Sequence, residues 1–76
     1  MNQTLMNVES GLKVRIAQLR SRPETCRRLR EMGFCENAVI RCVMNGDGGV
    51  ICEVCDARVG LNAELARDIV VSTVDE

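Results

Sequence analysis

Residues 50–61 read VICEVCDARVGL, and this pattern predicts a β-hairpin whose two-residue turn is Cys55-Asp56. The turn fixes the register of the two strands, because side chains alternate between the two faces of a strand. One face is then apolar and is made by Val50, Cys52, Val54, Ala57, Val59 and Leu61. The opposite face is expected to carry a cross-strand ion pair between Glu53 and Arg58.

A second hairpin is predicted immediately before the first. Residues 38–44, AVIRCVM, are β-prone and place Ile40, Cys42 and Met44 on one face. The segment NGDGG at 45–49 is a strong turn signal, because glycine and asparagine tolerate the backbone angles of tight turns. We therefore expect these residues to form a strand that turns directly into the first hairpin.

Two further strands complete the predicted sheet. Residues 12–19 read LKVRIAQL, and Leu12, Val14 and Ile16 alternate with polar residues as in a strand with one buried face. Near the other end of the chain, residues 68–74 read DIVVSTV and are expected to form the last strand.

A short helix is predicted between the first two strands. Ser21 followed by Glu24 has the spacing of a capping box, and Pro23 lies in the first turn, where its missing N–H does least harm. Gly33 is placed to end the helix in the left-handed conformation. Phe34 then follows where a Schellman motif returns an apolar side chain onto the helix.

These elements predict one mainly β domain. We expect a small closed antiparallel barrel of about five strands, with the helix after the first strand and a helical turn before the last. Asn62 is expected to cap that turn. Residues 1–10 are predicted to form a flexible leader and residues 11–74 the domain, with Asp75 and Glu76 in an exposed tail.

The composition argues against several classes of function. A chain of 76 residues has too little interior for a deep catalytic cleft, and it contains no His, so no enzyme and no cofactor is expected. Seven of the ten Lys and Arg residues lie in residues 1–30, but the net charge is −1 and Trp and Tyr are absent, which argues against nucleic-acid binding. No apolar run could cross a bilayer, so no direct membrane insertion is expected and the predicted location is the cytoplasm.

Cys52 and Cys55 form a C-x-x-C motif and are the weak candidates for a metal site, although no metal is expected. A closed zinc site needs four ligands. Completion would require a contribution from Cys26, Cys35 or Cys42, or from a second chain. Three interpretations stay open: cysteines that fill the core and a turn, a metal site, and a redox role.

The basic residues around the predicted helix are candidates for binding a partner protein. They are Arg20, Arg22, Arg27, Arg28 and Arg30. A cluster of this kind can steer and orient an acidic partner. The alternative is a solvated helix face with no partner.

Two segments resemble signatures of the FeoA family. Residues 29–34, LREMGF, are similar to the family's RL-x-x-LG-hydrophobic motif, and residues 66–71, ARDIVV, to its closing A-x-x-I-x-V. The similarity extends over residues 11–73. Cys35-Glu36-Asn37 replaces a Pro-Gly turn common in the family, but Asn37 can adopt positive φ and preserve that turn.

The resemblance implies an SH3-like barrel and a cytoplasmic accessory protein of bacterial ferrous iron uptake. Such a protein would bind and modulate the FeoB membrane transporter through its cytoplasmic region, at the inner face of the membrane. Whether it would act on GTP hydrolysis, gating or assembly stays open. The alternative function is a thiol-based metal-binding or metal-sensing module, and weak homo-oligomers could form through a strand face around Ile51.

Overall fold

The computed structural model describes residues 3–74, which form six strands, two α-helices and one 3-10 helix. In chain order they are β1 (Gln3–Thr4), η1 (Leu5–Asn7), β2 (Lys13–Leu19), α1 (Pro23–Glu31), β3 (Val39–Gly46), β4 (Gly49–Val54), β5 (Ala57–Asn62), α2 (Ala63–Arg67) and β6 (Ile69–Thr73). No helix in this part of the chain is long and apolar enough to cross a membrane. The predicted tail at Asp75 and Glu76, and the first two residues of the predicted leader, lie outside the described residues.

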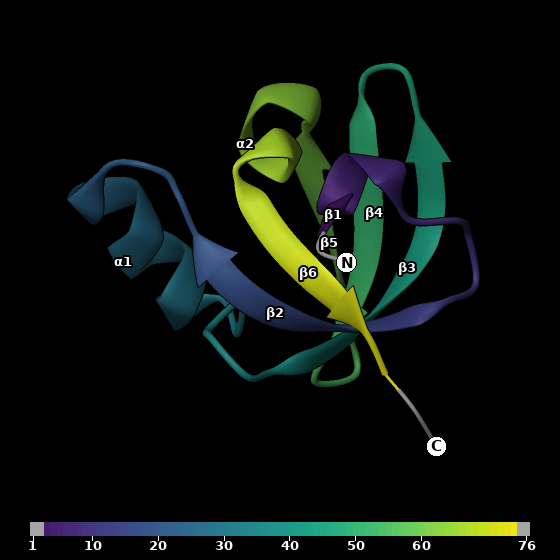
Figure 1. Ribbon diagram of the computed structural model, residues 1–76, viewed down its shortest axis with the longest axis horizontal. Coiled ribbons are helices and arrows are strands. Elements are labelled where there is room, and N and C mark those ends of the chain that lie inside the picture. The colour runs from purple at the N-terminus through teal and green to yellow at the C-terminus, as the bar shows by residue number, and fades with distance from the viewer. Residues whose placement is uncertain (1–2, 75–76) are drawn as a thin grey trace.

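The six strands form one antiparallel sheet in the order β1-β6-β2-β3-β4-β5. The sheet curls over its apolar face, α2 lies at one end of it, and α1 stands to one side (Figure 1). The mainly β prediction, with a helix after the first long strand and a helical turn before the last, is confirmed. The sheet is nevertheless open between β1 and β5, where a closed barrel of about five strands was predicted.

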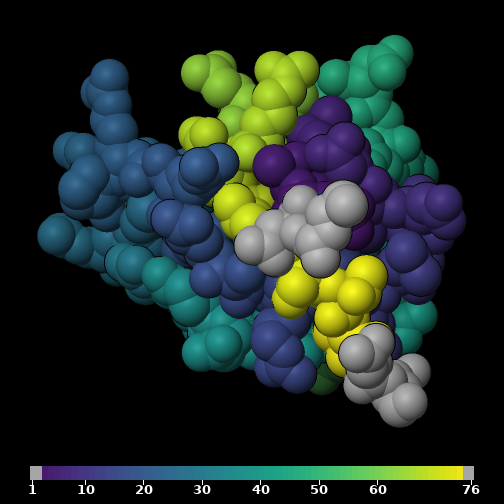
Figure 2. Space-filling view, viewed as in Figure 1, coloured from purple at the N-terminus to yellow at the C-terminus, as the bar shows by residue number. Residues whose placement is uncertain are grey.

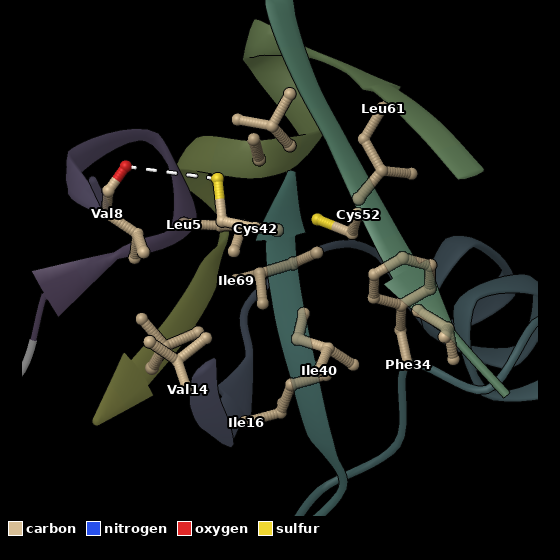
Figure 3. Close-up of a cluster of buried hydrophobic side chains, with 14 of the residues drawn as sticks. Leu5, Val8, Val14, Ile16, Phe34, Ile40, Cys42, Cys52, Leu61 and Ile69 are labelled. Atoms are coloured by element: carbon tan, nitrogen blue, oxygen red, sulfur yellow. Dashed lines mark hydrogen bonds between the residues drawn. The ribbon is translucent and has the colours of Figure 1, made fainter. Parts of the chain in front are cut away.

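The concave side of the sheet encloses a continuous apolar core (Figure 3). Its largest fully buried side chains are Phe34, Leu5, Ile16, Leu29, Ile40 and Ile69. Within residues 3–74 no polar or charged side chain is buried. The interior of the described domain is therefore packed by apolar side chains and cysteines.

The β4–β5 hairpin has the predicted register and turn. Cys55 and Asp56 have φ angles of 50° and 66°, the left-handed values that a two-residue turn of type I′ requires. One detail of the prediction is wrong: Glu53 and Arg58 are cross-strand partners but form no ion pair in the described structure. Ala57 pairs with Val54 as predicted and is exposed beside the turn.

The predicted flexible leader is wrong for residues 3–8. β1 pairs with β6, and Leu5 and Val8 are completely or almost completely buried in the core. Asn45 fastens this segment, because its side-chain amide donates hydrogen bonds of 2.8 Å to the carbonyl oxygens of both Met6 and Val8. The segment is part of the domain.

A β-bulge in β3 reverses the predicted orientation of Met44. The register shifts between Cys42, which pairs with Cys52, and Met44, which pairs with Ile51. An inserted residue moves every later side chain to the other face. Met44 therefore points outward with 58% of its surface exposed, while Asn45 turns toward the N-terminal segment.

Helix α1 ends as predicted but begins differently. Gly33 has a φ of 101°, and the N–H groups of Gly33 and Phe34 donate to the carbonyls of Arg30 and Leu29, which is a Schellman motif. At the other end no capping box forms. Arg22 is the N-cap residue without a side-chain cap, and Ser21 donates to the Asp68 carboxylate at 3.5 Å instead.

Of the remaining predictions about single residues, most are confirmed and the one for Leu12 is wrong. Asn62 caps α2 as predicted, accepting a 2.8 Å hydrogen bond from the Leu65 N–H, and Ala66 is buried. Asn37 adopts the expected positive φ of 74°. Leu12 is not in the core, because it precedes β2 and is 44% exposed.

Candidate functional site

Helix α1 projects from the side of the sheet and carries most of the predicted partner-binding residues (Figures 1 and 2). Cys26 and Leu29 are its buried residues, so only one side of the helix packs against the rest of the domain. Arg27, Arg28 and Arg30 are exposed around the rest of its surface. The structure therefore presents these three guanidinium groups to solvent on a protruding element.

Arg30 is held in place by a neighbouring acid that the sequence analysis did not connect to it. Its guanidinium donates two hydrogen bonds to the Glu36 carboxylate, at 3.2 and 2.9 Å. These hydrogen bonds from Arg30 lower the pKa of Glu36 to about 2, and the pair raises the pKa of Arg30. The charge of Arg30 is thus largely compensated, which leaves Arg27 and Arg28 as the uncompensated cations of the group.

Two acids lie beside Arg27 and Arg28 on the exposed side of α1. Residues three or four apart are neighbours on a helix surface, which places Glu24 one turn before the two arginines and Glu31 one turn after them. Neither acid forms a salt bridge in residues 3–74. The helix face is therefore of mixed charge with a basic excess.

Arg20 and Arg22 are exposed on different surfaces. Arg20 borders a depression next to β1 and β6, lined also by Gln3, Thr4, Gln18 and Val70. Arg22 borders a groove of about 300 Å³ between α1 and α2, where Glu64 and Asp68 are also present. The five arginines consequently do not form one patch.

Cys42 and Cys52 are cross-strand partners inside the core (Figure 3). The Cys42 thiol lies 3.9 Å from the Val8 carbonyl oxygen, to which it donates. Burial raises the pKa of the Cys42 thiol, and burial with the neighbouring Cys42 raises that of Cys52 to about 12. A neutral, enclosed thiol is a poor nucleophile and a poor metal ligand.

The C-x-x-C motif is split between the interior and the surface. Cys52 is buried, whereas Cys55 lies exposed in the β4–β5 turn and Cys35 is exposed after α1. Residues 3–74 contain no group of three or more Cys, Asp or Glu residues placed to hold a metal ion. The arrangement therefore favours the interpretation of core and turn cysteines over a metal site within one chain.

Two features of the structure were not predicted from the sequence. The Arg30–Glu36 pair could have been considered from charge alone, but its formation depends on the helix end at Gly33, where the chain turns between the two residues. The anchoring amide of Asn45 depends on the bulge in β3, for which the sequence carries no signal.

Comparison with known proteins finds relatives of this chain. The sequence matches the profile of the FeoA domain over residues 3–73. A crystal structure of an iron uptake regulatory protein (FeoA) is similar with a TM-score of 0.83 and 22% identity, covering 95% of this chain and 96% of that one. The solution structure of the FeoA protein from Chlorobium tepidum gives a TM-score of 0.87 at 15% identity, covering 96% and 71%.

A further similar structure is a manganese-dependent transcriptional repressor, with a TM-score of 0.87 at 18% identity over 96% of this chain and 41% of that one. No match was found among curated proteins. At these identities the likenesses establish the fold, and the predicted SH3-like architecture is confirmed. The profile begins at residue 3, so β1 and η1 belong to the domain.

Proposed function

Because this chain belongs to the FeoA domain family, which is related to ferrous iron transport, we propose that it binds and modulates a FeoB-type transporter through the transporter's cytoplasmic region. The protein then acts in the cytoplasm, at the inner face of the membrane. The family and the fold are those of non-enzymatic accessory domains.

The observation that carries this proposal is the match of the FeoA domain over residues 3–73. A core that encloses no polar or charged side chain in the described part of the chain agrees with it. A protein of this construction acts through its surface, by changing the population of states of a partner that it contacts.

The proposed docking element is α1, with Arg27 and Arg28 as its principal contacts. Both side chains are exposed, and no acid of residues 3–74 compensates them through a salt bridge. Arg30 is hydrogen-bonded to Glu36, which compensates its charge, so its contribution to docking is by packing against the partner more than by electrostatic attraction. Exposed charges of this kind steer association and set orientation, so binding should weaken as salt rises.

Calorimetry of the reduced protein with the cytoplasmic domain of a FeoB-type transporter, with and without guanine nucleotide, tests the proposal. We expect binding, and we expect the double variant Arg27→Ala/Arg28→Ala to weaken it about tenfold, equivalent to about 1.4 kcal/mol. Alanine has the highest helix propensity, so α1 should remain folded.

A matched control separates docking from net charge. Lys13→Ala/Arg67→Ala removes the same charge from two other exposed positions and should leave the affinity within about twofold, because screening limits the reach of distant charges. Equal weakening by both double variants contradicts docking through α1. Absence of binding by the unmodified protein in every nucleotide state contradicts the proposed function itself.

A further inference from the structure

Gly60 occupies a place where the fold does not require glycine. It lies within β5, and its φ is outside the left-handed range. A Cβ atom built at this position meets no other atom within 4 Å. Glycine inside a strand is unfavourable, and a common reason for it is the close approach of a ligand or another backbone.

The missing side chain leaves a shallow groove on the outer face of the sheet. Met44 and Ile51 are cross-strand partners there, with exposed fractions of 58% and 36%, and Ile51 is in turn the partner of Gly60. The groove has a volume of about 390 Å³ and a mainly apolar lining. Met44 and Ile51 therefore line this groove beside Gly60, which has no side chain to cover them.

The groove opens along an unpaired edge of the sheet. β5 pairs with β4 and with no other strand of residues 3–74. In a hairpin with a two-residue turn, Val54 and Ala57 exchange hydrogen bonds, and alternate positions then direct their backbone groups away from the partner strand. The N–H and C=O groups of Arg58 and Gly60 therefore point outward, where another strand can pair with them.

A row of charged side chains crosses the outer face of the sheet and has a cation at the β5 edge. Neighbouring strands place Lys13, Arg41, Glu53 and Arg58 in one row across the sheet. The row holds three cations and one acid, and Arg58 is its open end. An acidic residue on an added strand would continue the row with a favourable neighbour.

We propose that the β5 edge binds an extended segment of a partner protein by strand addition. A large apolar residue of that segment lies opposite Gly60 and fills the groove against Ile51. An antiparallel segment then places an acidic residue opposite Arg58, two positions further along. This is the known mode of β-augmentation, in which backbone hydrogen bonds supply affinity and alternate side chains supply specificity.

A second copy of this chain fits the groove less well. A two-fold pairing of β5 with itself that satisfies the same backbone groups sets Gly60 opposite Arg58, Gly60 or Asn62, depending on the register. None of these residues is a large apolar side chain, so the groove against Ile51 stays unfilled. The proposed binding site at the β5 edge is separate from α1, and it does not depend on the proposed transporter partner.

The test uses a blocked synthetic peptide, Thr-Val-Thr-Phe-Thr-Glu-Val-Thr, titrated to millimolar concentration into the isotope-labelled protein and followed by NMR. We expect the largest amide shifts at Arg58 and Gly60, with slower hydrogen exchange of both amides. Replacing Phe by Ser in the peptide, or Gly60→Thr in the protein, should weaken binding at least about tenfold, because both remove the filled groove. Replacing Glu by Lys should weaken it in a salt-dependent way.

Ser72→Thr, which adds a methyl group to a different strand, is the matched control and should bind the peptide normally. Absence of shifts at Arg58 and Gly60, or binding that Gly60→Thr leaves unchanged, overturns the proposal. A concentration-dependent dimer that Gly60→Thr abolishes also overturns it, in favour of self-association. Each outcome is independent of binding to the transporter domain, so this inference and the proposed function can fail separately.

Discussion

Replacing Asn45 by alanine should release the N-terminal segment from the body of the domain. The side-chain amide of Asn45 is the donor for two hydrogen bonds of 2.8 Å, to the carbonyl oxygens of Met6 and Val8. These bonds connect β3 to a segment whose Leu5 and Val8 side chains fill the core. Alanine removes both donors and leaves two carbonyl groups without these partners.

The magnitude follows from those two bonds. A hydrogen bond between neutral groups contributes about 0.5 to 1.5 kcal/mol net, so Asn45→Ala should lower the free energy of unfolding by about 1 to 3 kcal/mol. In a domain of this size each kcal/mol lowers Tm by about 4 to 8 °C. Asn45→Asp should cost more, because a carboxylate would face two carbonyl oxygens and could donate to neither.

Urea denaturation measures the loss, and hydrogen exchange shows where it acts. Exchange of amides in residues 3–8 should accelerate more than exchange in β4. The matched control is Asn7→Ala, in the same segment, whose amide oxygen accepts only from the exposed Thr4 hydroxyl at 2.8 Å. That change should cost no more than about 0.5 kcal/mol. Equal destabilisation by the two variants would refute the anchoring role of Asn45.

Three further predictions concern a pKa, the thiols and a helix end. The pKa of Glu36 is depressed in the folded protein, so its pairing with Arg30 contributes to stability at pH values above the ordinary carboxyl range, and this contribution is lost as the pH falls toward 2. An NMR titration of Glu36 should show a lowered midpoint, which Arg30→Ala should bring back toward the ordinary carboxyl value. An unshifted midpoint in the unmodified protein would contradict the pairing. Alkylation of the native protein should label two thiols rapidly and three only after unfolding, with mass spectrometry assigning the fast pair to Cys35 and Cys55 and the protected set to Cys26, Cys42 and Cys52; early labelling of the protected set would contradict their burial. Gly33→Ala should destabilise the domain by at least about 1 kcal/mol in thermal denaturation, because the φ of residue 33 is positive and the added Cβ would lie 2.6 Å from a Val54 side-chain carbon. Gly46→Ala is the control and should destabilise the domain less, because a Cβ at residue 46 has open space around it. Equal losses of stability would contradict the strain expected at the helix end.

The hairpins and the helix end could be predicted because their determinants are local. Alternation along residues 50–61 and a turn that accepts left-handed residues specify the β4–β5 register without any knowledge of the remaining chain. Gly33 and Phe34 likewise specify the helix end through backbone hydrogen bonds only a few residues apart. The local patterns and the tertiary structure agree at these positions.

The misjudged positions depend on partners distant in the sequence. β1 is a two-residue strand whose pairing requires β6, and the orientation of Met44 follows from a bulge that fits β3 against β4. The candidate site could be predicted to the extent that the α1 arginines are exposed. Their separation from Arg20 and Arg22 follows from the turn into α1, and the significance of Gly60 becomes apparent only once β5 is known to be an edge.

The position of β6 between β1 and β2 has a consequence for the synthesis of this protein. The first and third elements of the chain both pair with its final strand, so neither has its full set of hydrogen bonds until residues 69–73 have left the ribosome. Leu5 and Val8 are therefore buried late, although they are translated early. Contacts of such long sequence separation slow folding and leave apolar segments open to aggregation meanwhile. The domain should consequently complete its fold only once β6 is available for pairing, in one cooperative step.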